Sequence, residues 1–233
     1  MSLIRLDKFV SVALKLSRAD TKRLLKDGKI TVDGVCVKKG DFKVDTETAC
    51  VKSGNENLEY KEFVYILMNK PSGILSASND KRAKTVVDIV PPNLKREGLF
   101  PVGRLDKDTT GLLIITDDGD FAHKIISPKS NIEKVYLAHL DGDINDEMIE
   151  KFQKGVVLAD GTKCMSAKLE KAGDCSALVT IREGKYHQVK RMFGTVGLGV
   201  NKLHRISIGR LSLPKGLEAG SSMELTAEDL NRI

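Results

Sequence analysis

The chain has 233 residues, of which 41% are hydrophobic and 30% are charged, so its composition predicts folded domains rather than a disordered chain. Its apolar runs are too short to span a membrane, and its first residues lack the apolar core of a secretion signal, so we expect a cytoplasmic protein. The four cysteines form no Cys-x-x-Cys pair, which excludes a zinc ribbon and argues against disulfide bonds.

The positive charge of the chain is concentrated near its N-terminus. The net charge is +6, and residues 1–43 account for all of it, with eleven Lys and Arg against five Asp and Glu. A basic segment attached to a formally neutral body favours a module that docks on a polyanion, beside a domain with another task. Composition alone favours nucleic acid only weakly, because many basic segments are simply solvated faces.

Residues 5–28 are predicted to form two helices. In the first, apolar side chains recur at helical spacing: Leu6, Phe9, Val10, Ala13 and Leu14. Ser17 is a suitable N-cap for the second helix, and Gly28 is typical of a residue at a helix end. The second helix carries four cations on one broad arc, so it can pack through its leucines and still face phosphates: Arg18, Lys22, Arg23 and Lys26.

Two short apolar runs, residues 30–32 and 35–37, flank Asp33-Gly34, a pair typical of tight β-hairpins. Together with the first helix, the residues SRADTKRLLKDGKITVDG (17–34) resemble the S4 RNA-binding domain. The alternative is another small fold built on a hairpin of two helices. The resemblance implies binding to structured RNA, and by itself it implies no reaction.

The polar segment 53–57 is predicted to be a linker, which gives an S4 domain over residues 1–57 and a second domain over residues 58–233. Beyond it, apolar runs have the length of strands: 63–68, 112–115, 135–137, 156–158 and 177–181. Amphipathic segments between them predict helices, over residues 145–152 and 187–196, and Thr226 opens a last short helix. We expect an α+β domain with a mixed, largely antiparallel sheet and flanking helices.

The residues GRLDKDTTGLLIITDDG (103–119) are the most informative stretch of the chain. They describe a loop with glycines that leads into a buried strand, and Asp106 would lie just before that strand. Arg104 and Lys107, close in sequence, would keep its carboxylate ionised and able to act as nucleophile or general base. On physical grounds alone, a simple turn-forming Asp is the favoured alternative. The spacing matches neither a P-loop nor a calcium-binding loop.

This stretch resembles the signature motif of the pseudouridine synthases, specifically of their RsuA family. Three further segments resemble the remaining motifs in the right order: MNKPSGILS (68–76), EKVYLAHL (133–140), and EGKYHQVKRMF (183–193) followed by LHRISIG (203–209). The resemblance implies an enzyme that isomerises uridine in RNA. Because the isomerisation changes no oxidation state and needs no energy input, we expect no cofactor and no metal ion.

The resemblance also implies roles for individual residues. Asp106 corresponds to the family's nucleophile, and whether it attacks the ribose or the base stays open. Tyr136 corresponds to the tyrosine that stacks on the target base, and Leu203 to the apolar residue that packs against the uracil ring. Arg104 is expected to contact RNA near the extruded nucleotide, since a stacked uridine must leave the helix to react.

Lys190 corresponds to the basic residue that pairs with the catalytic Asp, where related enzymes carry Arg, and Arg191 is the alternative. We expect Lys185 and Arg205, with these two, to supply phosphate contacts beside the site. His187 is interpreted as a hydrogen-bonded residue next to the site rather than as an acid or base.

The compact length of the chain, without a basic C-terminal extension, favours a single uridine of small-subunit ribosomal RNA as the target. We expect a monomer that acts on ribosomal RNA or on a pre-ribosomal particle. Two alternatives stay open: a synthase for large-subunit ribosomal RNA, and a non-catalytic S4 protein that binds ribosomal RNA during assembly. A methyltransferase joined to an S4 domain is disfavoured, because no glycine-rich cofactor loop is present.

Overall fold

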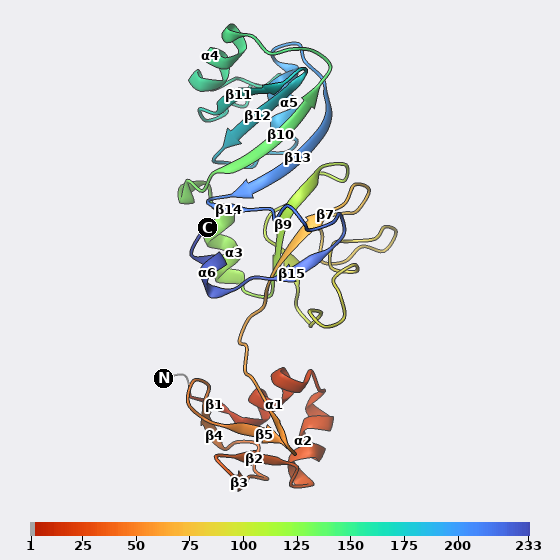
Figure 1. The fold of residues 1–233 in the computed structure, drawn as a ribbon, viewed down its shortest axis with the longest axis vertical. Coiled ribbons are helices and arrows are strands. Elements are labelled where there is room, and N and C mark those ends of the chain that lie inside the picture. The colour runs from red at the N-terminus through yellow and green to blue at the C-terminus, as the bar shows by residue number, and fades with distance from the viewer. Residues whose placement is uncertain (1–2) are drawn as a thin grey trace. The chain divides into compact units, whose positions relative to one another are not determined.

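The computed structural model describes residues 3–233 (Figure 1). The chain forms two compact units, Met1–Phe63 and Val64–Ile233. The second unit therefore begins six residues beyond the boundary expected from the sequence. Within the described residues, no helix is long and apolar enough to cross a membrane.

The first unit combines two helices with short strands (Figure 1). Its helices are α1 (Leu6–Leu14) and α2 (Arg18–Lys26). One sheet pairs β1 (Leu3–Arg5) with β4 (Lys43–Asp45), and the other has the order β3-β2-β5-β6: β2 (Ile30–Val32), β3 (Val35–Cys36), β5 (Val51–Ser53) and β6 (Glu56–Asn57). Apolar side chains of both helices and of the strands share one core.

The local signals in this unit are confirmed. The Ser17 hydroxyl accepts the backbone N–H of Asp20, which caps α2, and Gly28 follows the helix with a φ of 71°. Asp33 and Gly34 both have positive φ angles, 51° and 83°, as the tight turn between β2 and β3 requires.

The predicted linker at residues 53–57 is instead part of a β-hairpin. Ser53 pairs with Glu56 and Lys52 with Asn57, and Gly54 has a φ of 59° in the turn. Polar, turn-forming residues are equally suited to a linker and to a hairpin loop, so composition alone does not separate the two.

The second unit is built on a nine-stranded sheet with the order β11-β12-β10-β13-β9-β7-β15, to which β14 and β8 add at β13 and β9. The strands are β7 (Tyr65–Lys70), β8 (Phe100–Pro101), β9 (Thr110–Thr116), β10 (Lys134–Leu140), β11 (Lys168–Gly173), β12 (Ser176–Ile181), β13 (Val200–Ile208), β14 (Leu211–Ser212) and β15 (Ser222–Glu224). Strands β9 and β13 run parallel, and the other pairings between described strands are antiparallel. The expected mixed, largely antiparallel sheet is confirmed.

Both faces of strand β9 are covered. Leu113 and Ile115 belong to the larger core, which includes side chains of α4 (Asp146–Lys154) and α5 (Gln188–Gly194). Leu112 and Ile114 belong to a second core with α3 (Gly119–Ile126) and the C-terminal segment, which ends in α6 (Ala227–Leu230). A strand buried on both faces explains the continuous apolar run in this part of the sequence.

The two expected amphipathic helices and the capped C-terminal helix are confirmed. Asn145 caps α4, and Thr226 forms a capping box with Asp229 at α6. The strand expected at residues 156–158 is wrong: this segment is a loop with one isolated bridge, between Val157 and Lys163. A run of three apolar residues fits a buried loop as well as a strand.

The parallel junction between β9 and β13 explains the glycine in TTGLL. Gly111 lies opposite Arg205 with a φ of 100°, and a Cβ atom there would stand 2.3 Å from the Arg205 carbonyl oxygen. Only glycine allows the two backbones to approach this closely. The loop that carries Asp106 leads directly into this junction.

Candidate active site

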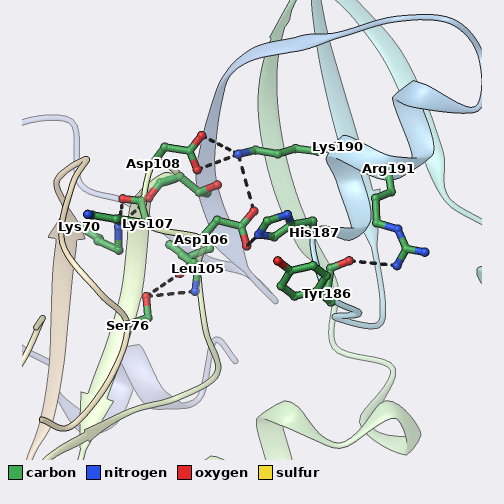
Figure 2. A network of polar contacts seen from close by, with 11 residues as sticks. Lys70, Ser76, Leu105, Asp106, Lys107, Asp108, Tyr186, His187, Lys190 and Arg191 are labelled. Atoms are coloured by element: carbon green, nitrogen blue, oxygen red, sulfur yellow. Dashed lines mark hydrogen bonds and ion pairs between the residues drawn. The ribbon is translucent and has the colours of Figure 1, made fainter. Parts of the chain in front are cut away.

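The loop before β9 is held by hydrogen bonds from two residues of the segment 68–76, Ser76 and Lys70. On one side, the Ser76 hydroxyl donates to the Leu105 carbonyl oxygen at 2.9 Å and accepts the Leu105 backbone N–H at 3.1 Å (Figure 2). Because Leu105 precedes Asp106, this pair of bonds fixes the backbone next to the carboxylate. Ser76 lies in the first motif segment and was given no role from the sequence.

On the other side, the loop is held by Lys70, which is fully buried. Its ammonium donates to the carbonyl oxygens of Pro71, Lys107 and Thr109 at 3.1, 3.1 and 2.9 Å. Burial lowers the pKa of Lys70 to about 8, although Asp108 and Asp106 act in the opposite direction. A buried ammonium bound to three carbonyls makes this loop a rigid support for a reactive side chain.

The Asp106 carboxylate is partly exposed, with 22% of the side chain accessible. Its two oxygens lie 3.4 Å from His187 Nε2 and 3.8 Å from Lys190 Nζ (Figure 2). The ion pairs of Asp106 thus come from the start of α5, and not from Arg104 and Lys107, which the sequence favoured because they are near in the chain.

Lys190 is shared between two carboxylates. Its ammonium lies 2.7 and 2.6 Å from the oxygens of Asp108, much closer than the 3.8 Å to Asp106. The hydrogen bond with Lys190 lowers the pKa of Asp108. Asp108 was not among the sequence-predicted residues, although it lies only two positions beyond Asp106. It holds the Lys190 ammonium at the side of the Asp106 carboxylate.

A small cavity of about 60 Å³ lies beside Asp106, and it brings together four predicted residues besides Asp106: Arg104, Tyr136, Lys185 and Leu203. Tyr136 on β10 and Leu203 on β13 are both buried. Arg104 is exposed at its rim. A carboxyl group next to a tyrosine ring and an apolar side chain suits a flat, uncharged base.

The turn before α5 presents two stacked rings. The ring centroids of Tyr186 and His187 are 3.9 Å apart with an angle of 15° between the planes. His187 has a φ of 47° and directs its Nε2 atom toward Asp106. This agrees with the interpretation of His187 as a residue beside the site, whereas Tyr186 was not singled out from the sequence.

A buried polar network supports the same turn. Glu183 is 7% exposed and accepts hydrogen bonds from the backbone N–H of Met165 and from Gln188 Nε2, at 2.9 and 2.7 Å. It also binds the ammonium of Lys185, which contacts the carbonyl oxygen of Lys163 at 3.1 Å. The charge of Lys185 is therefore already paired, although a phosphate contact was expected of it.

Two further predicted cations lie elsewhere. Arg191 pairs with Asp160 at 2.5 Å. It also donates to the Tyr186 carbonyl oxygen at 3.3 Å (Figure 2). Arg205 is 3% exposed, and its Nε donates to the Leu112 carbonyl oxygen at 2.7 Å. The expected phosphate contact of Arg205 is wrong, because the side chain points into the sheet, where its guanidinium also approaches the Tyr136 hydroxyl at 3.4 Å.

The first unit carries a hollow of about 1020 Å³ along α1 and α2. Six cations line it. Arg18, Lys22 and Lys26 were predicted from the sequence, whereas Arg5, Lys8 and Lys38 were not. Arg23, the fourth predicted cation, is not among the lining residues and pairs with Asp20 at 3.0 Å. Within residues 3–233, no group of three or more His, Cys, Asp and Glu side chains could hold a metal ion.

The family described as RNA pseudouridylate synthase matches residues 64–195, which include the Asp106 loop and the turn before α5, and the S4 domain matches residues 4–49. The chain belongs to the RNA pseudouridylate synthase family. It is an enzyme of the RNA pseudouridine synthase type with an RNA-binding S4 domain, as the resemblance in the sequence implied. A non-catalytic S4 protein is thereby excluded.

Individual relatives of this RNA pseudouridine synthase match along nearly its whole length. The uncharacterized RNA pseudouridine synthase YtzG of Bacillus subtilis (strain 168) is 43% identical, over 98% of this chain and 97% of the relative. Ribosomal small subunit pseudouridine synthase A of Vibrio cholerae is 40% identical, over 99% of each chain. A crystal structure of a pseudouridylate synthase matches with a TM-score of 0.69 and 34% identity, over 98% of this chain and 99% of the other.

Proposed function

We propose that this RNA pseudouridine synthase converts one uridine of small-subunit ribosomal RNA to pseudouridine, with Asp106 as the nucleophile and without a cofactor. The observation that carries the proposal is the Asp106 carboxylate, held on a braced loop beside a cavity that Tyr136 and Leu203 line. The name of the Vibrio cholerae relative supports the choice of the small-subunit RNA.

The reaction rearranges bonds within one nucleotide. The bond between ribose C1′ and uracil N1 breaks, the uracil turns, and a bond forms between C1′ and C5. The hydrogen of C5 is released as a proton, and N1 gains a proton, so atoms and electrons balance without an external oxidant or reductant. Asp106 is the nucleophile: its carboxylate bonds transiently to the ribose or to the base, and this bond breaks again as the product forms. The Lys190 ammonium lies 3.8 Å from the carboxylate and stabilises its negative charge.

The cavity in the second unit selects the base by shape. Tyr136 offers a ring and a hydroxyl, and Leu203 offers an apolar surface, to a planar uracil.

The first unit supplies the RNA affinity in this proposal. Six cations around one hollow suit the phosphates of structured RNA, and binding there offsets the cost of extruding the target, a few kcal/mol. The docking step and the chemical step are therefore assigned to different units of the chain.

Release of tritium from an RNA labelled at uridine C5 tests the proposal, because the hydrogen of C5 leaves when the new bond forms. The substrates are unmodified transcripts of small-subunit and large-subunit ribosomal RNA. We expect one equivalent of tritium from the small-subunit RNA, and a loss of at least about 10³-fold in rate for Asp106→Asn. Release only from the large-subunit RNA would overturn the choice of substrate, and full activity of Asp106→Asn would overturn the nucleophile.

A further inference from the structure

Tyr186 has an unusual combination of size and exposure. The residue is 76% exposed, the highest value among the exposed large hydrophobic residues of the described chain. One face of the Tyr186 ring stacks on the His187 ring, with 3.9 Å between the ring centroids. The other face of the ring is open to a ligand.

This open ring lies next to the reacting group. Nε2 of His187 is 3.4 Å from the Asp106 carboxylate, and Tyr186 stacks on the same His187 ring (Figure 2). Tyr136, by contrast, is 7% exposed and lines the inner cavity. The two tyrosines therefore offer two different surfaces, one inside the pocket and one at its mouth.

The turn that carries Tyr186 is braced from both ends. On one side, the Tyr186 carbonyl oxygen accepts Arg191 Nη1 at 3.3 Å, and Arg191 is itself anchored on Asp160. On the other side, the backbone N–H of Lys185 donates to Gln188 Oε1 at 2.9 Å, and Gln188 is bound to buried Glu183. An exposed ring on a fixed turn loses little freedom when a flat ligand stacks on it.

We infer that the outer face of Tyr186 is a stacking platform for an unpaired nucleobase that flanks the target uridine in the RNA. The inference rests on the proposed function of the site. Extruding the target removes the stacking partner of its neighbours, and an aromatic face replaces such a partner whatever the base, because every base has a π-face. The exposed cation Arg104 at the rim of the same cavity complements the phosphate of that nucleotide.

Three substitutions separate the ring from other properties of Tyr186. The assay is single-turnover tritium release from the small-subunit RNA transcript, with the full-length protein. Tyr186→Phe keeps the ring and should behave like the wild type, within about 2-fold. Tyr186→Leu and Tyr186→Ala should raise the RNA concentration for half-maximal rate by roughly 5- to 150-fold, the range for loss of one base stack.

The rate at saturating RNA distinguishes stacking from an indirect effect through His187. We expect this rate to change by less than about 3-fold in Tyr186→Leu and Tyr186→Ala. Val157→Ala, which alters another exposed apolar side chain of the second unit, should leave both parameters unchanged. Wild-type half-saturation in Tyr186→Ala, an equal loss in Tyr186→Phe, or a loss confined to the saturating rate would each overturn the platform.

Fluorescence separates this inference from the proposed function. The chain has four tyrosines and no tryptophan, so emission from Tyr186 can be isolated as the difference between Asp106→Asn and the double variant Asp106→Asn with Tyr186→Phe. Binding of the same transcript should quench that difference signal. A wild type without any tritium release, but with quenching, would sink the proposed reaction and keep the platform; an unquenched signal on saturating RNA would sink the platform alone.

Discussion

The cations of the two units are arranged in opposite ways. In the first unit, six of them line an open hollow along two helices, and within the described residues only Arg5 of these six pairs with a carboxylate, that of Asp7. In the second unit, most cations near the site are already paired with carboxylates, Lys190 with Asp108 and Lys185 with Glu183, or are buried like Arg205, whereas Arg104 is exposed. One unit is therefore suited to attract a polyanion, whereas the other uses most of its charges to fix the shape of the candidate active site. Net charge identifies the first kind of region and overlooks the second.

The largest expected effect breaks the second unit at the junction of β9 and β13. Gly111→Ala places a methyl group 2.3 Å from the Arg205 carbonyl oxygen and imposes a positive φ on an alanine, so the strands must separate. We expect a loss of about 3 kcal/mol or more in the free energy of unfolding, measured by urea denaturation.

Gly119→Ala is the matched control, since a Cβ atom there meets no neighbour within 4 Å. Its stability should stay within about 0.5 kcal/mol of the wild type. Equal stability of the two variants would show that the close approach of the strands does not hold the junction together.

The next effect concerns the buried ammonium of Lys70, whose pKa of about 8 lies below the ordinary value of 10.5. Between pH about 8 and pH 10.5 the unfolded chain retains a proton on Lys70 that the folded chain has released. The free energy of unfolding therefore rises with pH in this range, and the gain is lost as the pH falls through about 8. From pH about 7.5 to about 9.5, the wild type should gain about 2 kcal/mol relative to Lys70→Met. Parallel urea midpoints for both proteins across this range would contradict the assignment.

A smaller effect is expected on the salt dependence of RNA binding, and it separates cations without a carboxylate partner from paired ones. Replacing both Lys22 and Lys26 with Gln removes two charges from the hollow, so the slope of log affinity against log salt should become shallower by about 2. Arg23→Gln on the same helix, and Lys185→Gln in the second unit, should leave the slope nearly unchanged, because both side chains have carboxylate partners. A filter-binding series with the ribosomal RNA transcript measures all three. Equal slopes in the three variants would contradict the distinction between the cations of the hollow and the ion-paired cations.

Features encoded by neighbouring residues could be predicted from the sequence. The Ser17 cap, the Asp33-Gly34 turn and the position of Asp106 before a strand all depend on a few consecutive residues, and the structure places them as expected. The roles of Lys70 and Ser76 could not be predicted in this way. Their partners lie 29 to 39 residues further along the chain, and only the sheet topology brings them to the Asp106 loop.

The burial of Arg205 could have been predicted from the alternation of side chains along a strand. Residues two apart on a strand face the same side, and Leu203 was already expected to face the target base. Arg205 therefore had to share that buried side of β13, which the structure confirms for both residues. The 53–57 hairpin is a different case, because its sequence is compatible with either outcome until its partner strand is known.

The most direct test of the division between docking and chemistry is carbodiimide primer extension on ribosomal RNA from a strain that lacks this protein. We expect one pseudouridine stop on the small-subunit RNA to disappear, to return with the wild-type protein, and to stay absent with Asp106→Asn even though that variant still binds the RNA. A stop that returns in full with Asp106→Asn would contradict the account.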